Sequence, residues 1–337
     1  MRLRLLTAVV AFALALVAAG SAAAYPWPVR PFNKPHPVRA NLGDPRTIFD
    51  LSFFQNGIEG PGSFQFHNGV DISAPDGTPV YPVVSGTVRL IERGSEITVK
   101  TNDNRTFQYF HVVPTVADGE QVVAKKTLLG HVALTYGHVH LTEIRGFRVW
   151  NPLAKGGLAP YRDTTKPRVA SIFMRAPGAQ APLDPLGICG TVSLVAEASD
   201  KPSMRVPGTF AGFPVSPALV TWSLRKVGGA VLQPTVPVYD VRTGLPAPRE
   251  FWDIYARGTY QNAPRFANRQ FSLMPGRYLY NLNSSFDTRT VANGVYEVTV
   301  RAADIRDNAS VLSQRFTIVN HPGSPTGCAP APSKKSL

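Results

Sequence analysis

Cysteine is nearly absent from this sequence, whose 337 residues include only Cys189 and Cys328. No C-x-x-C pair exists, which excludes a cysteine zinc knuckle and a scaffold of many disulfides. In an exported chain, this pair is expected to form one disulfide. That bond would close a long loop and contribute on the order of 4 kcal/mol. The alternative is two free buried thiols.

Long apolar runs are also scarce. One runs from residue 5 to 19, after two arginines, and alanines at 22 to 24 follow it. This pattern predicts a signal peptide over residues 1–24. The run is short for a spanning helix and no stop-transfer cluster follows, which argues against the alternative of an uncleaved anchor. The sequence therefore predicts a secreted, periplasmic or cell-wall associated protein with no membrane span after cleavage.

Dense lysine and arginine runs with interleaved aromatic residues are missing as well, which argues against nucleic acid as a partner. The formal net charge is nevertheless +13. Without the two arginines of the predicted signal peptide it is +11, because 33 of the 35 basic residues then face 22 acidic ones. A basic exported protein suits an anionic surface such as the bacterial cell envelope.

Helical periodicity of useful length is absent, whereas 31 prolines and 28 glycines indicate turns and short strands. The sequence therefore predicts an all-β fold. Alternating runs such as "SEITVKT" and "RTFQYFHVV" predict a first antiparallel β domain over residues 47–160. The Pro-rich residues 25–46 before it are expected to form an extended arm.

A second β domain is predicted after a linker at residues 161–167. Residues 168–320 contain further strands spaced by turns, which favour an immunoglobulin-like β-sandwich. Residues 321–337 are rich in proline, serine and glycine and are expected to be a disordered tail, except where Cys328 ties it back.

Histidine carries the chemistry of the first domain. The stretch "FHNGVDI" places His67 and Asp71 four residues apart, and "GHVHL" places His138 and His140 two apart. On a strand, residues two apart point to the same face, so both imidazoles can enter one cavity. "YFHVV" places His111 in another predicted strand. Each motif alone is typical of a surface pair or an exposed polar stripe, so the interpretation depends on their convergence.

Zinc chemistry would explain this set. Zn²⁺ in hydrolytic sites takes three protein ligands from histidine and carboxylate and keeps a fourth position for water. Such a site leaves the metal able to acidify that water. The spare histidines would then accept a proton and donate a hydrogen bond to the oxyanion. Gly69 is expected to let the chain turn so that His67 and Asp71 reach one ion.

Four segments in order resemble one known family. They are "FHNGVDISAPDGTPVYPVVSGTV", "QYFHVV", "GEQVVAKKTLLGHV" and "GHVHLTEI". They are similar to the lysostaphin/LytM-type zinc metalloendopeptidases, peptidoglycan hydrolases with a duplicated hybrid motif fold. The resemblance covers about a third of the chain. It implies His67, Asp71 and His140 as zinc ligands and His138 and His111 as the catalytic pair. We expect His138 to be the general base and His111 to stabilise the oxyanion, although these two roles are interchangeable.

Two departures from the family pattern stand out. The family commonly has a glutamate two places after the last ligand, where this chain has Thr142, and Glu143 one place later would face the other side of a strand. The segment "LTYG" before H-x-H is also short of the usual glycine-rich loop. Both are expected to change the rim of the site and the substrate preference. His131 is expected to be structural, and Tyr109 and Tyr136 are expected to be packing residues.

The preferred hypothesis is an exported zinc metalloendopeptidase that hydrolyses peptide cross-links or stem peptides of bacterial peptidoglycan. One alternative is a non-catalytic cell-wall binding or activator module of the same fold. Another makes the second domain, as an adhesion or carbohydrate-binding module, the functional part. The presence of all five site residues favours catalysis over the alternatives.

Overall fold

The computed structural model describes residues 24–48, 63–91, 96–267, 270–321, 323–324 and 326–328. Strands dominate it, so the predicted all-β class is confirmed. None of the helices in these residues is long and apolar enough to cross a membrane. Apart from Ala24, the predicted signal peptide lies outside the described residues.

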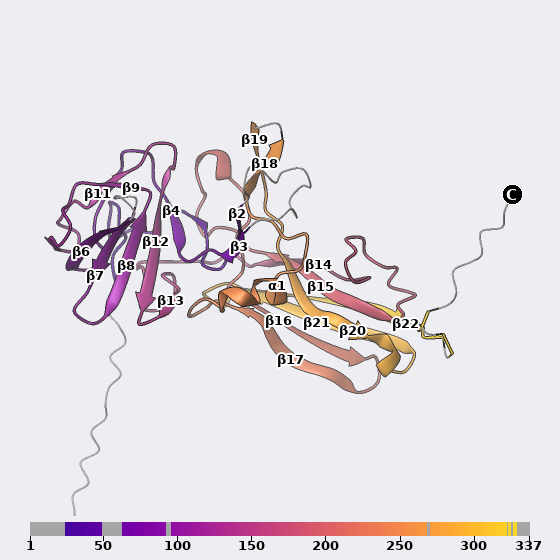
Figure 1. Ribbon diagram of the computed structural model, residues 1–337. Coiled ribbons are helices and arrows are strands. Elements are labelled where there is room, and N and C mark those ends of the chain that lie inside the picture. The colour runs from indigo at the N-terminus through magenta and orange to yellow at the C-terminus, as the bar shows by residue number, and fades with distance from the viewer. Residues whose placement is uncertain are drawn as a thin grey trace, which may run out of the picture.

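A large antiparallel sheet forms the first domain, drawn in purple shades in Figure 1. In spatial order its strands are β1 (Val38–Ala40), β4 (Val70–Ser73), β12 (His138–Arg145), β8 (Arg105–Phe110), β7 (Glu96–Lys100), β6 (Gly86–Ile91) and β10 (Gln121–Val122), and β13 (Arg148–Trp150) also pairs with β12. Strand β12 is central: it pairs with β4 through its first half and with β8 through most of its length.

Alternation along β12 separates the core from the site. Val139 and Leu141 are fully buried in the core of the first domain. His138 and His140 occupy the intervening positions, so they point to the opposite face of the sheet. The spacing of two therefore places both imidazoles on one side, as the sequence predicted.

Smaller strand groups complete the first domain. One sheet contains β5 (Pro79–Val80), β11 (Gly130–Val132) and β9 (Val112–Pro114), and a separate pair contains β2 (Pro45–Ile48) and β3 (Ser63–Phe66). Val80, Val112 and Val132 of the three-stranded sheet pack in the same apolar cluster as Ile97 and Phe107 of the large sheet. This shared core fixes the two sheets against each other.

The Pro-rich segment expected as an arm is built into this domain. Trp27 is fully buried in the core, and its indole N–H donates to the carbonyl of Pro160 at 2.9 Å. Tyr25 is also buried and donates from its hydroxyl to Glu143 at 2.8 Å. Further along the segment, β1 pairs with β4 and so forms one edge of the large sheet.

The second domain consists of two antiparallel sheets. One contains β14 (Arg168–Arg175), β15 (Thr191–Ser199) and β20 (Leu279–Asp287), and the other contains β17 (Val231–Asp240), β16 (Leu219–Lys226), β21 (Gly294–Ala303) and β22 (Ala309–Ile318). Met174, Tyr280, Trp222 and Val300, from both sheets, share one core, which makes the domain a β-sandwich. The immunoglobulin-like assignment stays a prediction.

Short elements connect these sheets, and one covalent bond closes the domain. The short elements are η3 (Gly208–Phe210), η4 (Pro248–Glu250), α1 (Phe251–Ile254), the paired strands β18 (Ala263–Ala267) and β19 (Gln270–Met274), and η5 (Thr288–Thr290). Cys189 and Cys328 form a disulfide across 139 residues of sequence, so the predicted pairing is confirmed.

A loop between β1 and β2 joins the two domains. Asp44 accepts hydrogen bonds at one oxygen from the backbone N–H of Ser216 at 2.8 Å and from its hydroxyl at 2.6 Å. Tyr255 donates from its hydroxyl to the carbonyl of Gly43 at 2.8 Å. Leu42 is fully buried and belongs to the core of the sandwich. We call this segment, residues 41–44, the bridging loop.

Three carboxylates meet near the same junction. Oxygens of Asp163, Asp200 and Asp304 lie within 4.8 Å of one another. Asp200 is 3% exposed, and its carboxyl group accepts the backbone N–H of Lys201 at 2.8 Å. Burial raises the pKa of Asp200 to about 8, and the negative charges of the other two carboxylates add to this effect. This cluster therefore favours a protonated Asp200 at neutral pH.

Candidate metal centre and active site

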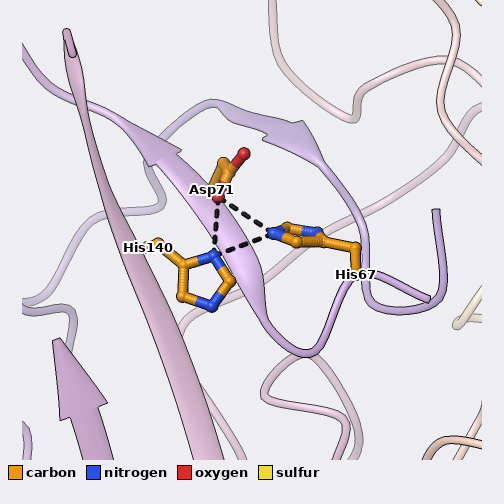
Figure 2. Close-up of side chains that lie close together, drawn as sticks. All are labelled: His67, Asp71 and His140. Carbon is orange, nitrogen blue, oxygen red and sulfur yellow. Dashed lines mark hydrogen bonds and ion pairs between the residues drawn. The ribbon is translucent and has the colours of Figure 1, made fainter. Parts of the chain in front are cut away.

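Three side chains converge at one end of the large sheet. His67 follows β3, Asp71 lies in β4 and His140 lies in β12, directly opposite Asp71 in the strand pairing. His67 Nε2 lies 3.1 Å from Asp71 Oδ1 and 2.9 Å from His140 Nδ1, and the last two atoms are 3.0 Å apart. Figure 2 shows the three groups pointing toward one another.

This arrangement fits a zinc ion. Ligands bonded at about 2.0–2.1 Å in tetrahedral geometry lie about 3.3 Å apart, close to the three separations of the triangle. The exposed fractions of His67, Asp71 and His140 are 3%, 3% and 7%. Two imidazoles and one carboxylate are a donor set typical of hydrolytic zinc sites. Among the described residues, two groups of side chains could hold a metal ion, and this is the group that combines histidine with carboxylate.

Hydrogen bonds on the far side of each imidazole set its tautomer. His67 Nδ1 lies 2.8 Å from the carbonyl of Asn41 and must donate to it, which leaves the lone pair on Nε2. His140 Nε2 lies 2.9 Å from the hydroxyl of Thr142, and an Nε2–H that donates to this hydroxyl leaves the lone pair on Nδ1. Such outer partners orient metal-binding histidines and raise their basicity. Both lone pairs therefore point into the triangle.

Arg46 holds the carboxylate of Asp71. Its Nη2 pairs with Asp71 Oδ2 at 2.7 Å, while Oδ1 faces the two histidines. The carboxylate is thus oriented to offer one oxygen to the triangle. Nothing in the sequence motif pointed to Arg46, because it lies 25 residues before its partner in the separate β2 strand.

Gly69 is required for close packing. Its φ does not fall in the left-handed region. A Cβ at this position would lie 2.4 Å from the carbonyl oxygen of Leu141 and 2.7 Å from His140 Nε2. Such distances force β12 or the imidazole to shift. The expected role, a turn that only glycine permits, is therefore replaced by a close approach between the loop and the neighbouring strand.

His138 stands beside the triangle. Its Nδ1 donates to the carbonyl of Tyr136 at 2.8 Å, so the lone pair is on Nε2. That atom lies 3.5 Å from Asp71 Oδ1 and 3.5 Å from Nη2 of Arg39. His138 is 4% exposed. An unprotonated imidazole nitrogen therefore faces the place where substrate would meet the triangle.

His111 lies next to His138. Its ring stacks on Tyr136 with centroids 4.1 Å apart, and it lies 4.6 Å from the ring of His138. Its backbone φ is +62°, the left-handed region that non-glycine residues rarely adopt and that is concentrated at functional sites. No hydrogen bond to this ring is present in the described part of the chain. The imidazole is therefore positioned by stacking and is open to a ligand.

An open cavity of about 540 Å³ surrounds these groups. The lining residues are Arg39, Arg46, Gln65, Phe66, His67, Asn68, Asp71, Phe110, His111, Tyr136, His138, His140 and Gln261. All belong to the first domain or its N-terminal segment except Gln261, which lies just before β18 in the second. The cavity is therefore walled by both domains.

Comparison with known proteins identifies the first domain. The profile of peptidase family M23 matches residues 65–149, which contain the whole triangle and both further histidines. This domain belongs to peptidase family M23. The predicted lysostaphin/LytM-type family is therefore confirmed for the M23 domain. No curated protein sequence matches the chain significantly.

Three solved structures are similar to the chain. A mutant catalytic domain of the prophage-encoded M23 protein EnpA from Enterococcus faecalis is 24% identical, covers 41% of this chain and 100% of its own, and has a TM-score of 0.28. A zinc-containing peptidase from Vibrio cholerae is 22% identical over 33% and 39% of the two chains, with a TM-score of 0.24. Lysostaphin is 14% identical, and the match covers 85% of this chain and 94% of lysostaphin, with a TM-score of 0.26.

Burial keeps three histidines of the M23 domain neutral. Burial lowers the pKa of His67 to about 3, of His111 to about 3 and of His138 to about 4. Burial acts to raise the pKa of Asp71, but its interactions with the neighbouring His67 and His138 and with the Arg46 guanidinium outweigh burial and hold that pKa well below its usual range. Neutral imidazoles and an ionised carboxylate are the forms that bind a metal ion.

The first departure from the family pattern involves two residues, Glu143 and Thr142, with different outcomes. Glu143 is fully buried on the opposite face of β12, where it pairs with Arg145 at 2.7 Å, as expected. Thr142 is expected to affect the rim of the site more than the proposed ligands, but its hydroxyl also lies 2.9 Å from His140 Nε2. The second nitrogen of the His140 imidazole is therefore in contact with a hydroxyl group.

Other singled-out residues lie where packing was expected, with one exception. Tyr109 is fully buried and accepts the backbone N–H of Val83 at 2.8 Å. His131 lies in β11 and does not line the cavity. Tyr136, also expected to be a packing residue, is 45% exposed and lines the cavity against His111. Its position just before the H-x-H motif is the sequence feature that could have indicated a place in the cavity.

Proposed function

We propose that the chain is an exported zinc metalloendopeptidase that hydrolyses peptide cross-links or stem peptides of bacterial peptidoglycan. The observation that supports this most strongly is the triangle of His67 Nε2, Asp71 Oδ1 and His140 Nδ1 inside a domain of a peptidase family. In this proposal the three residues are the zinc ligands. When bound there, zinc would supply a Lewis acid that polarises the scissile carbonyl and acidifies water.

His138 acts as the general base. Its Nε2 carries the lone pair because Nδ1 donates to the carbonyl of Tyr136. This nitrogen accepts the proton of the attacking water and later delivers it to the leaving amine. The hydrogen bond to Tyr136 keeps the ring in one orientation through both transfers.

His111 stabilises the tetrahedral oxyanion. It is held by stacking on Tyr136 and has no fixed hydrogen bond in the described residues, so one ring N–H is available to the substrate. The two histidine rings lie 4.6 Å apart, which allows them to contact one peptide bond from neighbouring positions. The hydrogen bond of His138 Nδ1 to Tyr136 supports this assignment of the two roles, which stays part of the proposal.

The location of the enzyme follows from its sequence. Residues 1–24 are proposed as a signal peptide, and the mature chain would carry a formal charge of +11. A basic exported protein is suited to the anionic cell envelope where peptidoglycan lies. The open cavity of about 540 Å³ suits an extended peptide.

The test combines zinc content and hydrolysis. The purified mature protein is expected to contain about one zinc per chain by elemental mass spectrometry and to release peptides from isolated peptidoglycan, identified by mass spectrometry. His140→Ala should lose both properties. His131→Ala is the matched control, because His131 lies in the same domain but outside the cavity.

Two outcomes would contradict the proposal. A wild-type protein that holds zinc but cleaves no peptidoglycan peptide would be a binding or activator module. Hydrolysis that persists in zinc-free His140→Ala protein would mean that the triangle is not the catalytic centre.

A further inference from the structure

A β-bulge aims one arginine into the site cavity. In the pairing of β1 with β4, Val38 lies opposite Ile72 and Ala40 opposite Asp71. Two steps along β1 thus match one step along β4, which makes Arg39 the extra residue. Bulges re-aim side chains and are frequent beside active sites. Arg39 lines the cavity next to the strand that carries Asp71.

The contacts of Arg39 orient it without neutralising its charge. Its Nη1 donates to the carbonyl of Tyr136 at 3.2 Å, and Nη2 lies 3.5 Å from His138 Nε2. Its guanidinium lies 4.3 Å from the ring centroid of Phe210, which belongs to η3 of the second domain. No carboxylate among the described residues lies within ion-pair distance of it. The cation is therefore fixed on three sides and lacks an anionic partner there.

The cavity as a whole has surplus positive charge. Asp71 is the one acidic side chain among its described lining residues, and its Oδ2 is already paired with Arg46. Two guanidinium groups thus face one carboxylate, and both stay charged because arginine is not deprotonated in proteins. A zinc ion in the triangle would add further positive charge. Such a cavity favours an anionic ligand, and guanidinium groups are suited to carboxylates.

We propose that Arg39 binds a free carboxylate of the peptide substrate beside the scissile bond, so that the enzyme selects acidic peptides over neutral ones. This inference rests on the proposed function and adds a specificity residue to it. The stack on Phe210 holds the guanidinium in place, which reduces the entropy lost when substrate binds. Because η3 supplies that ring, the second domain takes part in substrate selection.

The test uses two forms of the same cross-linked muropeptide, one with free carboxylates and one with these converted to carboxamides. The wild type is expected to show a kcat/KM about ten- to a hundred-fold higher for the carboxylate form, the range expected for one charge-assisted hydrogen bond. Arg39→Gln should remove this preference, mainly through KM of the carboxylate form, so that kcat/KM falls much more for the carboxylate form than for the carboxamide form, while the zinc content is unchanged.

Two further variants control for folding and for general loss of charge. Arg39→Lys should restore part of the preference, because lysine keeps the charge but lacks the planar fork of donors. Arg30→Gln is the matched control: Arg30 lies in the same N-terminal segment and packs on Tyr81, with its guanidinium 5.1 Å from the ring centroid, but does not line the cavity. It should keep the full preference.

Several results would overturn the inference. Equal rates for both muropeptides in the wild type would exclude carboxylate selection. An equal loss for both forms in Arg39→Gln would make Arg39 a positioning residue for His138. If zinc-loaded wild type cleaves neither form, the proposed function fails, and calorimetric binding of the same pair decides on Arg39. Tighter binding of the carboxylate form that is lost in Arg39→Gln supports it, and equal binding overturns it.

Discussion

Replacing Asp200 with asparagine should stabilise the protein at neutral pH. The residue is 3% exposed and close to two other carboxylates, and the backbone N–H of Lys201 donates to its carboxyl group. Burial, with those charges, raises its pKa to about 8. Asparagine keeps an oxygen for the N–H of Lys201 and adds an amide that can donate to Asp163 or Asp304.

The magnitude follows from proton linkage. An unfolded aspartate ionises near pH 3.9, whereas folded Asp200 stays protonated to about pH 8, so the folded state binds more protons between these values. Wild-type stability from this group therefore falls as pH rises from about 4 to 8. The slope is about 1.4 kcal/mol per pH unit, and the accumulated cost at pH 7.5 is at most about 5 kcal/mol.

Urea unfolding of wild type and Asp200→Asn, in buffers with EDTA, measures this cost. The stability gained by the variant should be about 2.5 kcal/mol larger at pH 7.5 than at pH 5.5. Asp240→Asn is the control, because Asp240 pairs with Arg242 at 2.6 Å and its pKa is lowered. That variant should gain nothing as pH rises. An Asp200→Asn gain that is the same at both pH values would refute the reasoning.

Three other substitutions test single features. Replacing Cys189 and Cys328 together with serine should lower the free energy of unfolding by about 4–5 kcal/mol, measured by urea unfolding, because the disulfide closes 139 residues. Thr142→Val removes the hydroxyl that lies 2.9 Å from His140 Nε2 and should weaken zinc binding about ten- to a hundred-fold in chelator competition; unchanged affinity would show that the hydroxyl does not orient the ring. Gly69→Ala should lower zinc content, since its Cβ would lie 2.4 Å from the backbone of β12; normal zinc content would mean that the loop adjusts.

Local patterns predicted the centre of the site because the chemistry there depends on strand periodicity. The spacing of two in "GHVHL" places His138 and His140 on one face of any strand, and the spacing of four around Gly69 brings two donors to one turn. Strand alternation likewise separated Thr142 from Glu143. These relations involve neighbours in sequence, so a sequence reader can derive them from backbone geometry alone.

The surroundings of the site depend on tertiary contacts and were not predictable in this way. Arg46 reaches Asp71 from a separate strand, and Arg39 enters the cavity only because β1 carries a bulge. Proline-rich composition indicated an extended arm, but it could not indicate that Trp27 is buried in the core. The packing of Phe210 and Gln261 beside the cavity depends on how two domains meet, which no local pattern encodes.

The bridging loop makes the peptidase and the sandwich one mechanical unit. The carbonyls of Asn41 and Asp44 receive the imidazole N–H and backbone N–H of His67 at 2.8 Å each, while Ser216 of the sandwich anchors the carboxylate of Asp44. A peptidase domain separated from the sandwich would keep all three side chains of the triangle. It would lose the contact with Ser216 that supports the loop to which His67 is hydrogen-bonded. Transplanting the domain into another protein would therefore require carrying part of the sandwich with it.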